Sequence, residues 1–199
     1  MDRQPILDGE RLLLRPLVRE DWAALYAIAS DREIWAGHPS HDRWQEPVFR
    51  AFFEDALAGG GALAIVDKAT GALIGSSRYG GEGDAKLSGA IEIGWSFLAR
   101  SYWGKGYNAE FKRLMIAHAL AHYERVEFQV GADNVISRGA MANIGGQLVP
   151  GLGATYERCG VMVHHVVFEI TRESFALGPL SRAGSASAGD SGRARRSPD

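Results

Sequence analysis

The stretch of sequence that decides the fold is LARSYWGKGYNA, residues 98–109, in which Gly104 and Gly106 stand between an expected strand and the longest expected helix. The N–H groups at a helix start have no acceptor within the helix and together carry about +0.5 charge. Glycines at this position let a bulky anion approach the backbone. The stretch therefore indicates a phosphate-binding site, although a turn that needs positive φ at one glycine would use the same residues.

The segments on both sides of this loop alternate between the two hydrophobic periods, which predicts a mixed sheet. The expected strands are 11–17, 62–67, 72–79, 90–98, 125–131 and 164–170, and the expected helices are 20–30, 47–57, 107–123 and 135–144. A strand, a crossover helix and a second strand imply one parallel pair. The predicted fold class is α/β (α+β), with a mainly antiparallel sheet of six to seven strands and helices on both faces.

Composition limits the class of protein. With 199 residues, 46% hydrophobic and 23% charged, the chain fits one globular domain. The formal net charge of −2 provides no overall positive field, so we expect no nucleic-acid partner. The single cysteine, Cys159, cannot form an internal disulfide, and no apolar run reaches 18 residues. We therefore predict a cytoplasmic protein with no membrane partner.

The end of the chain differs in composition from the rest. Residues 181–199, SRAGSASAGDSGRARRSPD, contain no aromatic and no β-branched residue, and their four Arg and two Asp give +2 against −4 for the preceding residues. Such a segment cannot bury enough apolar surface to fold. We predict a folded domain over 1–176 and a disordered Gly/Ser/Arg-rich tail over 177–199.

Two well-known phosphate motifs compare poorly with the glycine loop. The nucleoside-triphosphate pattern needs glycine at position 99, where Ala99 stands, and Ser or Thr at Gly106, so it is excluded. Gly104, Gly106 and Ala109 match the dinucleotide pattern G-x-G-x-x-G/A, with Asp133 near the expected acidic position. However, about 90 residues follow the loop, too few for the rest of a doubly wound sheet. A nicotinamide-dependent enzyme is thus a third-ranked alternative.

A third phosphate motif fits the order of the elements. The window WGKGYN, residues 103–108, resembles the Q/R-x-x-G-x-G/A signature of the Gcn5-related N-acetyltransferases (GNAT), especially their ribosomal-protein N-terminal acetyltransferase branch, RimJ and RimL. Trp103 replaces the leading Gln/Arg, as is common in that branch, and Asn108 replaces the second glycine. The resemblance covers about 11–171. It implies the acyl-CoA N-acyltransferase fold, in which the parallel strands splay apart.

The resemblance also implies a cofactor site for acetyl-CoA, without a metal. Backbone amides around the loop would bind the pyrophosphate, backbone groups of the preceding strand would pair with the pantetheine arm, and an asparagine would bond to the arm. The residues are Gly104, Lys105, Gly106, Asn108 and Ala109 for the pyrophosphate, and Ser96, Leu98 and Asn134 for the arm. Asn134 could equally be the N-cap of the helix that follows it.

Acetyl transfer to an amine needs a base, for which Glu92 is the candidate. Alternation places Glu92 on one face of its strand with the small residues Ala90, Gly94 and Ser96, which leaves room for a substrate. It lies eleven residues before Trp103, the spacing of the catalytic glutamate in the histone-acetylating branch of the family. We expect Glu92 to act through a water molecule; an ordinary polar residue on a half-wet strand is the alternative.

The acid that protonates the leaving thiolate is less clear from the sequence. Many relatives use a tyrosine seven residues after the asparagine, but Met141 stands there. The branch resemblance points to Ser137, three residues after Asn134, although a helix serine bonded to its own backbone is an alternative.

A polar and aromatic loop before the second helix is expected to line the entrance for the acceptor, through Trp35, His38 and Arg43. In the same loop His38, His41 and Asp42 lack a fourth ligand, so we expect no metal there.

The sequence therefore predicts an acetyl-CoA-dependent N-acetyltransferase that acts directly on a primary amine, either of a small molecule or of a peptide N-terminus or lysine. The missing tyrosine and Asn108 leave a non-catalytic CoA-binding regulatory module as the alternative. A slightly acidic core hints at a cationic acceptor. An exposed sheet edge near the last strand could pair two copies of the chain as a homodimer.

Overall fold

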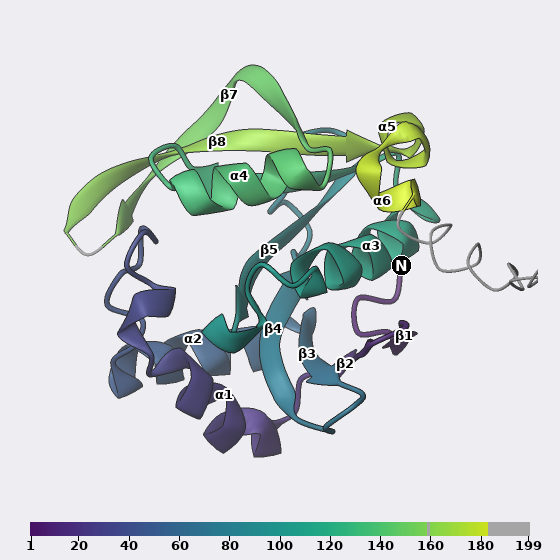
Figure 1. Cartoon of the computed structure of the whole chain (residues 1–199). Helices are drawn as coiled ribbons and strands as arrows, with labels where there is room; N and C mark the ends of the chain where they lie inside the picture. Colours follow the sequence, from purple (N-terminus) through teal and green to yellow (C-terminus); the bar gives the residue numbers. More distant parts are fainter. Residues whose placement is uncertain (159, 183–199) are drawn as a thin grey trace, which may run out of the picture.

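The computed structural model describes residues 1–158 and 160–182 and arranges eight strands in one sheet (Figure 1). Their order across the sheet is β1-β2-β3-β4-β5-β6-β8-β7, and β5 and β6 form its parallel pair. The strands are β1 Leu7–Asp8, β2 Leu12–Pro16, β3 Ala62–Asp67, β4 Leu73–Tyr79, β5 Ala90–Leu98, β6 Arg125–Gly131, β7 Gln147–Arg158 and β8 Val161–Thr171. The predicted fold class is confirmed.

Helices cover both faces of this sheet. They are α1 Trp22–Ala29, α2 Glu46–Gly59, α3 Tyr107–Leu120, α4 Val135–Asn143, α5 Arg172–Leu177 and α6 Pro179–Arg182, with short 3-10 turns η1 Arg19–Asp21, η2 Arg32–Ile34 and η3 Arg100–Tyr102. On one face of the sheet, Phe111 and Met115 of α3 are fully buried in one hydrophobic cluster. On the other face, Phe49 and Phe53 of α2 are buried in a second cluster. Two hydrophobic clusters thus hold the sheet from opposite sides.

Strand β7 is the longest of the strands and α-helices that the sequence did not reveal, the others being β1, α5 and α6. Its sequence, QLVPGLGATYER, contains a proline and two glycines, and the strand is mostly exposed. The register with β8 shifts between Leu148 and Gly153, so the pairing is interrupted. Hydrophobic alternation is too weak in such an edge strand to be recognised. The free sheet edge beside the last strand therefore belongs to β7.

A bulge in β5 changes which side chains share a face. Arg78 of β4 pairs with Gly94 and Ser76 pairs with Phe97, so two residues of β5 lie opposite one of β4. Trp95 in the bulge has φ of +52°, and the Arg78 guanidinium lies 4.1 Å from its ring centre. The predicted face was wrong beyond Gly94, because alternation restarts after the bulge. Ser96 contacts α3, whereas Glu92 faces the opposite side of the sheet.

The parallel pair is short, and this opens the sheet. Cα pairing between β5 and β6 covers Ala90–Glu92 against Arg125–Glu127. The second half of β5 pairs with β4 on its other side, and the second half of β6 pairs with β8. Among the described residues, the β5 edge from Ile93 to Leu98 therefore has no strand partner toward β6. This is the splay that the family resemblance implied.

The first residues of the predicted tail form a helix. Residues 177–182 were assigned to the tail, but α6 lies there and Leu180 is only 3% exposed, because it packs into the cluster beneath α3. Apolar burial of Leu180 thus extends the folded part beyond 176. Residues 183–199, like Cys159, lie outside the described residues.

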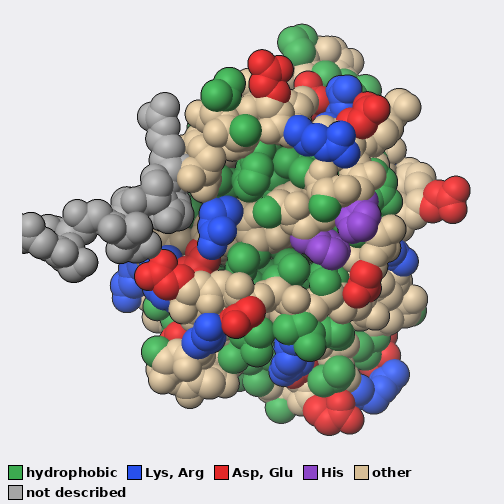
Figure 2. Space-filling model, turned by 90° about the vertical axis from the view of Figure 1, so that its right-hand side faces the viewer, with side chains coloured by type: hydrophobic (Ala, Val, Ile, Leu, Met, Phe, Trp, Pro, Cys, Tyr) green, Lys and Arg blue, Asp and Glu red, His purple; other side chains and the backbone are tan. Residues whose placement is uncertain are grey.

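The surface carries both signs of charge. Figure 2 shows Lys and Arg side chains interspersed with Asp and Glu on one side of the molecule. Within the described part of the chain, no helix has the length and apolar character to span a membrane.

Candidate active site

The glycine loop forms an open cradle at the start of α3. Gly104 and Gly106 have φ of +69° and +83°, and Gly106 is the N-cap of the helix. A Cβ at Gly104 would meet no atom within 4 Å. Because the first N–H groups of a helix lack acceptors within it, the amides after Gly106 are available to an anion.

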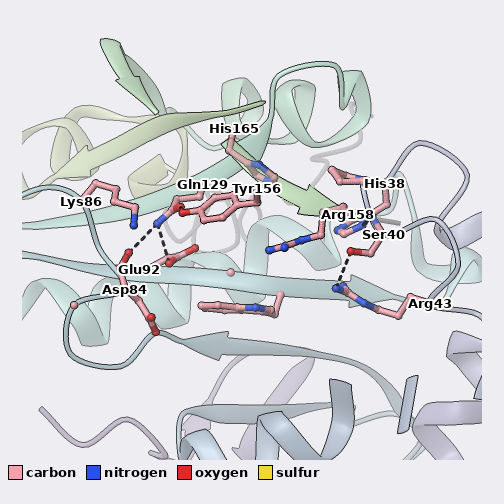
Figure 3. A pocket seen from close by; sticks show the side chains of 14 residues that line it. His38, Ser40, Arg43, Asp84, Lys86, Glu92, Gln129, Tyr156, Arg158 and His165 are labelled. Carbon is pink, nitrogen blue, oxygen red and sulfur yellow. Dashed lines mark hydrogen bonds between the residues drawn. The ribbon is translucent and has the colours of Figure 1, made fainter. Parts of the chain in front are cut away.

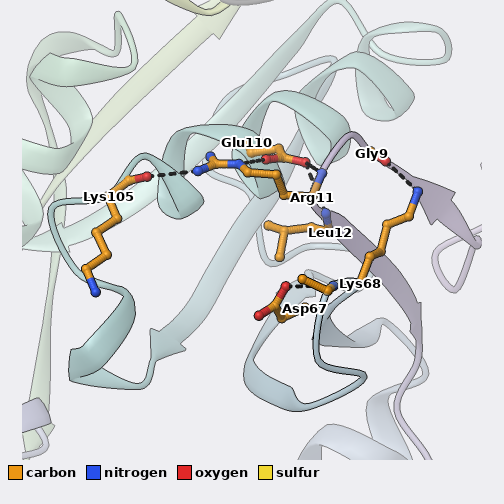
Figure 4. Close-up of polar contacts among 8 residues, drawn as sticks. Gly9, Arg11, Leu12, Asp67, Lys68, Lys105 and Glu110 are labelled. Carbon is orange, nitrogen blue, oxygen red and sulfur yellow. Dashed lines mark hydrogen bonds and ion pairs between the residues drawn. The ribbon is translucent and has the colours of Figure 1, made fainter.

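An ion pair between the partly exposed Arg11 and the buried Glu110 fixes this loop to the N-terminal strand (Figure 4). Glu110 of α3 is 8% exposed and accepts bonds from the backbone N–H of Arg11 (2.7 Å) and of Leu12 (3.1 Å). The Arg11 side chain donates from Nε to Glu110 Oε2 (2.8 Å) and from Nη1 to the Lys105 carbonyl (3.0 Å). The guanidinium thus binds the loop through the Lys105 carbonyl and adds positive charge beside the helix start. Nothing in the sequence pattern signalled this pairing.

The remaining predicted cofactor residues lie around the splay. Ser96 and Leu98 are on the part of β5 that faces the gap. Asn134 follows β6, is 7% exposed, and its Oδ1 accepts a bond from the backbone N–H of Ser137 (3.1 Å). The N-cap alternative for Asn134 is thus confirmed, while its predicted bond to the pantetheine arm stays a prediction. Ser137 lies half-buried in the first turn of α4.

A buried lysine, which the sequence analysis missed, lies under the splay. Lys112 of α3 is 3% exposed, and its Nζ donates to Ser96 Oγ (2.9 Å) between the rings of Phe111 and Phe128. Burial lowers the pKa of Lys112 to about 7, and the opposing charge of Glu92 reduces that shift. Its place at an otherwise apolar helix position was the only available signal.

A cavity of about 300 Å³ opens on the side of β5 that carries Glu92 (Figure 3). Its walls come from the loop before α2, the loop before β5, the strands β5 and β6, and the hairpin of β7 and β8. The lining residues are His38, Pro39, Ser40, Arg43, Gly83, Asp84, Lys86, Glu92, Gly94, Trp95, Gln129, Tyr156, Arg158 and His165. Glu92 is therefore part of the cavity wall.

Glu92 is a buried carboxylate beside a second one. It is 7% exposed, and its neighbour across the parallel pair is Glu127, which is fully buried. Burial, and next to it the negative charge of Glu127, raise the pKa of Glu92 to about 8. Glu127 instead accepts bonds from the backbone N–H groups of Lys86 and Leu87 (2.7 and 2.8 Å). The pair therefore combines one structural carboxylate with one that binds protons near neutral pH.

Gln129 of β6 orients these carboxylates. Its Nε2 lies 3.1 Å from Glu92 Oε2, 3.1 Å from Glu127 Oε1 and 2.9 Å from the Asp84 carbonyl, while its Oε1 accepts from Tyr156 Oη (2.8 Å). Tyr156 comes from β7, so a strand absent from the prediction completes this network. The sequence gave no indication of either residue.

Part of the loop that was expected at the acceptor entrance lines this cavity, and its role toward an acceptor stays a prediction. His38 and Arg43 line the cavity. Trp35 does not, and this prediction was wrong because its ring is 1% exposed in the core and its Nε1 donates to the Ala29 carbonyl (2.8 Å). Met141, at the position of the missing tyrosine, is also a core residue. The described residues contain no cluster of three metal-ligating side chains of His, Cys, Asp or Glu.

The arrangement fits a long substrate with a phosphate at one end. The open helix start could hold the phosphate, the unpaired edge of β5 could pair with an extended amide-containing arm, and the arm's far end would reach the bulge beside Glu92. A basic carboxylate in a cavity at that end is suited to removing a proton.

Comparison with known proteins decides the family. A family model of the acetyltransferase (GNAT) domain matches residues 11–147. The chain belongs to the GNAT family. Similar structures include a GNAT protein from Chromobacterium violaceum (22% identity, 85% of this chain and 87% of that one, TM-score 0.74) and a Gcn5-related N-acetyltransferase from Brucella melitensis (20%, 92% and 85%, 0.72). RimJ from Mycobacterium smegmatis, solved with CoA-disulfide, also matches (20%, 92% and 95%, 0.67).

These matches confirm the family that the glycine loop indicated. These three solved structures are distant in sequence, so their likeness shows the GNAT fold, and one of them is RimJ, a member of the branch that the sequence resembles. Acetyl-CoA is the acetyl donor of this family of transferases. The acceptor and the roles of individual residues are matters for proposal.

Proposed function

We propose that the protein is an acetyl-CoA-dependent N-acetyltransferase that transfers the acetyl group directly to a primary amine, with Glu92 as the general base. The observation that supports this most is the position of Glu92: a buried carboxylate on the wall of a cavity, next to the bulge where β5 leaves β6. Membership of the GNAT family supports the reaction class.

The free energy needed to deprotonate the acceptor amine shows what the base must supply. An amine with a pKa of about 10.4 costs roughly 4.6 kcal/mol to deprotonate at pH 7, and an α-amine near 8 costs about 1.4 kcal/mol. A carboxylate with a pKa of about 8 is a better proton acceptor than one near 4.5. Glu92 would take the proton through a water molecule, while Gln129 holds the carboxylate in position.

The residues around the loop fit the acetyl donor. Acetyl-CoA, when bound, would supply an activated thioester. Its pyrophosphate would be held by the backbone of Gly104, Lys105, Gly106, Asn108 and Ala109, and its arm by Ser96, Leu98 and Asn134. The support is the open cradle, the free edge of β5 and the buried Asn134 amide at the end of β6.

Proton balance at the end of the reaction requires a donor. As the N–C bond forms and the C–S bond breaks, the amine proton passes to Glu92, and the leaving thiolate takes a proton elsewhere. Ser137 is proposed to relay this proton, taking one from water as its hydroxyl gives one to the thiolate, because its half-buried position in the first turn of α4 lies beyond the same strand end as Asn134.

A CoA-release assay over a panel of primary amines, run beside an acetyl-CoA binding titration, tests the proposal. Release of CoA that depends on an amine is the expected result. Acetyl-CoA binding without release across the panel would favour the non-catalytic CoA-binding module. Stabilisation by NAD rather than by acetyl-CoA in a thermal-shift experiment would contradict the assignment of acetyl-CoA as the co-substrate.

A further inference from the structure

The two ends of the cavity differ in charge. In Figure 3, Glu92, Asp84 and Lys86 lie toward one end, and His38, Arg43 and Arg158 lie toward the other. Asp84 and Glu92 are the carboxylates among the described residues that line the cavity. The proposed base therefore lies at the end that holds both lining carboxylates together with Lys86, and the two lining arginines lie at the other end.

At the basic end of the cavity, Arg43 and Arg158 each pack against an aromatic ring. The Arg43 guanidinium lies 4.3 Å from the ring centre of Phe52, and its Nη2 donates to Ser40 Oγ (3.2 Å). Arg158 lies 5.2 Å from the ring centre of Tyr156 and donates to the Glu157 carbonyl (2.8 Å). Stacking on a ring fixes the plane of a guanidinium without cancelling its charge. The printed contacts of Arg158, with a carbonyl and a ring, leave its positive charge able to attract an anion.

His38 adds a neutral donor at the same end. Its Nδ1 accepts the backbone N–H of Ser40 (2.9 Å), so the proton of the neutral ring is on Nε2. Burial, followed by the positive charges of Arg43, His165 and Arg158, lowers the pKa of His38 to about 3. The ring is therefore neutral near pH 7.

From this separation of charge we propose that the acceptor is a small molecule that carries an anionic group, a carboxylate or a phosphate, in addition to its primary amine. The amine would lie at Glu92, and the anion between Arg43 and Arg158. A volume of about 300 Å³ is at the small end of ligand sites, which favours a small acceptor over a peptide. The inference rests on the proposed function and specifies its substrate class.

Matched acceptors test the anionic group. CoA release is measured with β-alanine against β-alaninamide, with phosphoethanolamine against ethanolamine, and with propanediamine. We expect kcat/KM to be at least about 10-fold higher for the anionic member of one pair, since charge-assisted bonds to arginine are the strong ones. The pair that responds distinguishes a carboxylate from a phosphate. Equal rates within both pairs, or preference for propanediamine, would overturn the inference and leave the proposed function intact.

Variants of Arg158 test the origin of the preference. Arg158→Gln should reduce the preference for the anionic acceptor about 10-fold, and Arg158→Glu should shift it toward propanediamine. Arg19→Gln, which changes an exposed arginine of η1 that pairs with Glu54 and does not line the cavity, is the matched control and should leave the preference unchanged. If Arg158→Glu still prefers the anionic acceptor, the acceptor's anionic group does not bind at the end of the cavity that Arg158 lines.

Binding separates the two possible failures. If no amine in the panel is acetylated, the proposed function fails, and thermal shift of the CoA-saturated protein with β-alanine and β-alaninamide then decides the inference by itself. Equal shifts would overturn it. A short peptide amine preferred over every small acceptor would overturn the small-molecule part of the inference.

Discussion

The glycine loop and the acceptor cavity are the two halves of one proposed site, and they are built in different ways. The loop, from Gly104 to Ala109, offers backbone N–H groups from six consecutive residues at the start of α3. The cavity uses side chains from segments as distant as His38 and His165. The first can hold the same phosphate with many side-chain sequences, whereas the second depends on the identity of each residue.

This difference teaches where specificity resides. A backbone cradle needs two glycines with positive φ and a helix start, all of which are local in sequence. The cavity needs a bulge at Trp95, an added strand, and a glutamine that links two carboxylates. Substrate class should therefore vary through the cavity while the donor site stays the same. Substitutions that act on only one half test this separation.

The largest effect is expected from Glu92→Gln. Loss of a positioned general base should lower turnover by about 10² to 10⁴-fold, while the Kd for acetyl-CoA changes by less than about 3-fold. Because the base acts only when deprotonated, kcat/KM of the unaltered protein should rise with pH up to a pKa of about 8, and this limb should disappear in the variant. Steady-state kinetics between pH 6 and pH 9.5, together with a binding titration, measure both.

A matched control keeps this result interpretable. Glu54→Gln removes an exposed carboxylate on α2 that pairs with Arg19 at the surface, so it should retain both turnover and the pH profile. Turnover of Glu92→Gln close to that of the control would remove Glu92 from the mechanism.

The second effect belongs to the loop. Gly104→Ala places a methyl group where the phosphate is expected, and should weaken acetyl-CoA binding by about 10-fold without changing the preference among acceptors. Gly71→Ala is a close control: both glycines have φ of +69°, and a Cβ at either meets nothing within 4 Å. Both variants then have the same backbone strain, about 1 kcal/mol, and only Gly104→Ala also affects the expected phosphate site. Equal affinities by calorimetry would place the pyrophosphate elsewhere.

The same contrast explains what the sequence could predict. The parallel pair, the loop and the cofactor family follow from local patterns: the predicted bounds of β5 and β6 match the structure, and the family model confirms the resemblance. Glu92 was found because a charged residue interrupts an apolar strand. Gln129, Tyr156 and Arg158 were missed. Gln129 reaches Glu92 through the parallel pairing of β5 with β6, and Tyr156 and Arg158 reach the cavity only through the pairing of β6 with β8 and of β8 with β7.

Two errors have a similar cause. Trp35 was placed at the acceptor entrance from its loop position, but its indole fills the core beneath Phe97. Ser96 was placed on the Glu92 face by simple alternation, which cannot register a one-residue bulge. Tertiary packing decided both positions, and neither leaves a signal in a single sequence.

A third, smaller effect tests how the two halves meet at Lys112, which reaches from α3 to Ser96 on β5. Its folded pKa is about 7, below the unfolded value near 10.4, so the unfolded chain binds more protons between these pH values. Stability should therefore rise with pH across this window. Lys112→Met should lack this rise, which we expect to be on the order of 2 kcal/mol. Urea unfolding at pH 7 and pH 10 measures the free energy of unfolding of both proteins. The same change with pH in the unaltered protein and in Lys112→Met would contradict a lowered pKa of Lys112.

The smallest effect separates the two roles of Asn134, which are open until measured. Asn134→Ser retains a side-chain oxygen that can cap α4, so stability should change by only a few tenths of a kcal/mol, whereas Asn134→Ala should cost about 1 kcal/mol. If the amide also bonds to the pantetheine arm, both variants should weaken acetyl-CoA binding by about 3- to 10-fold, because a net hydrogen bond contributes about 1 kcal/mol. Serine that restores stability and leaves acetyl-CoA affinity untouched would assign Asn134 to the cap alone. The donor site would then depend on backbone groups even more completely than the comparison with the cavity requires.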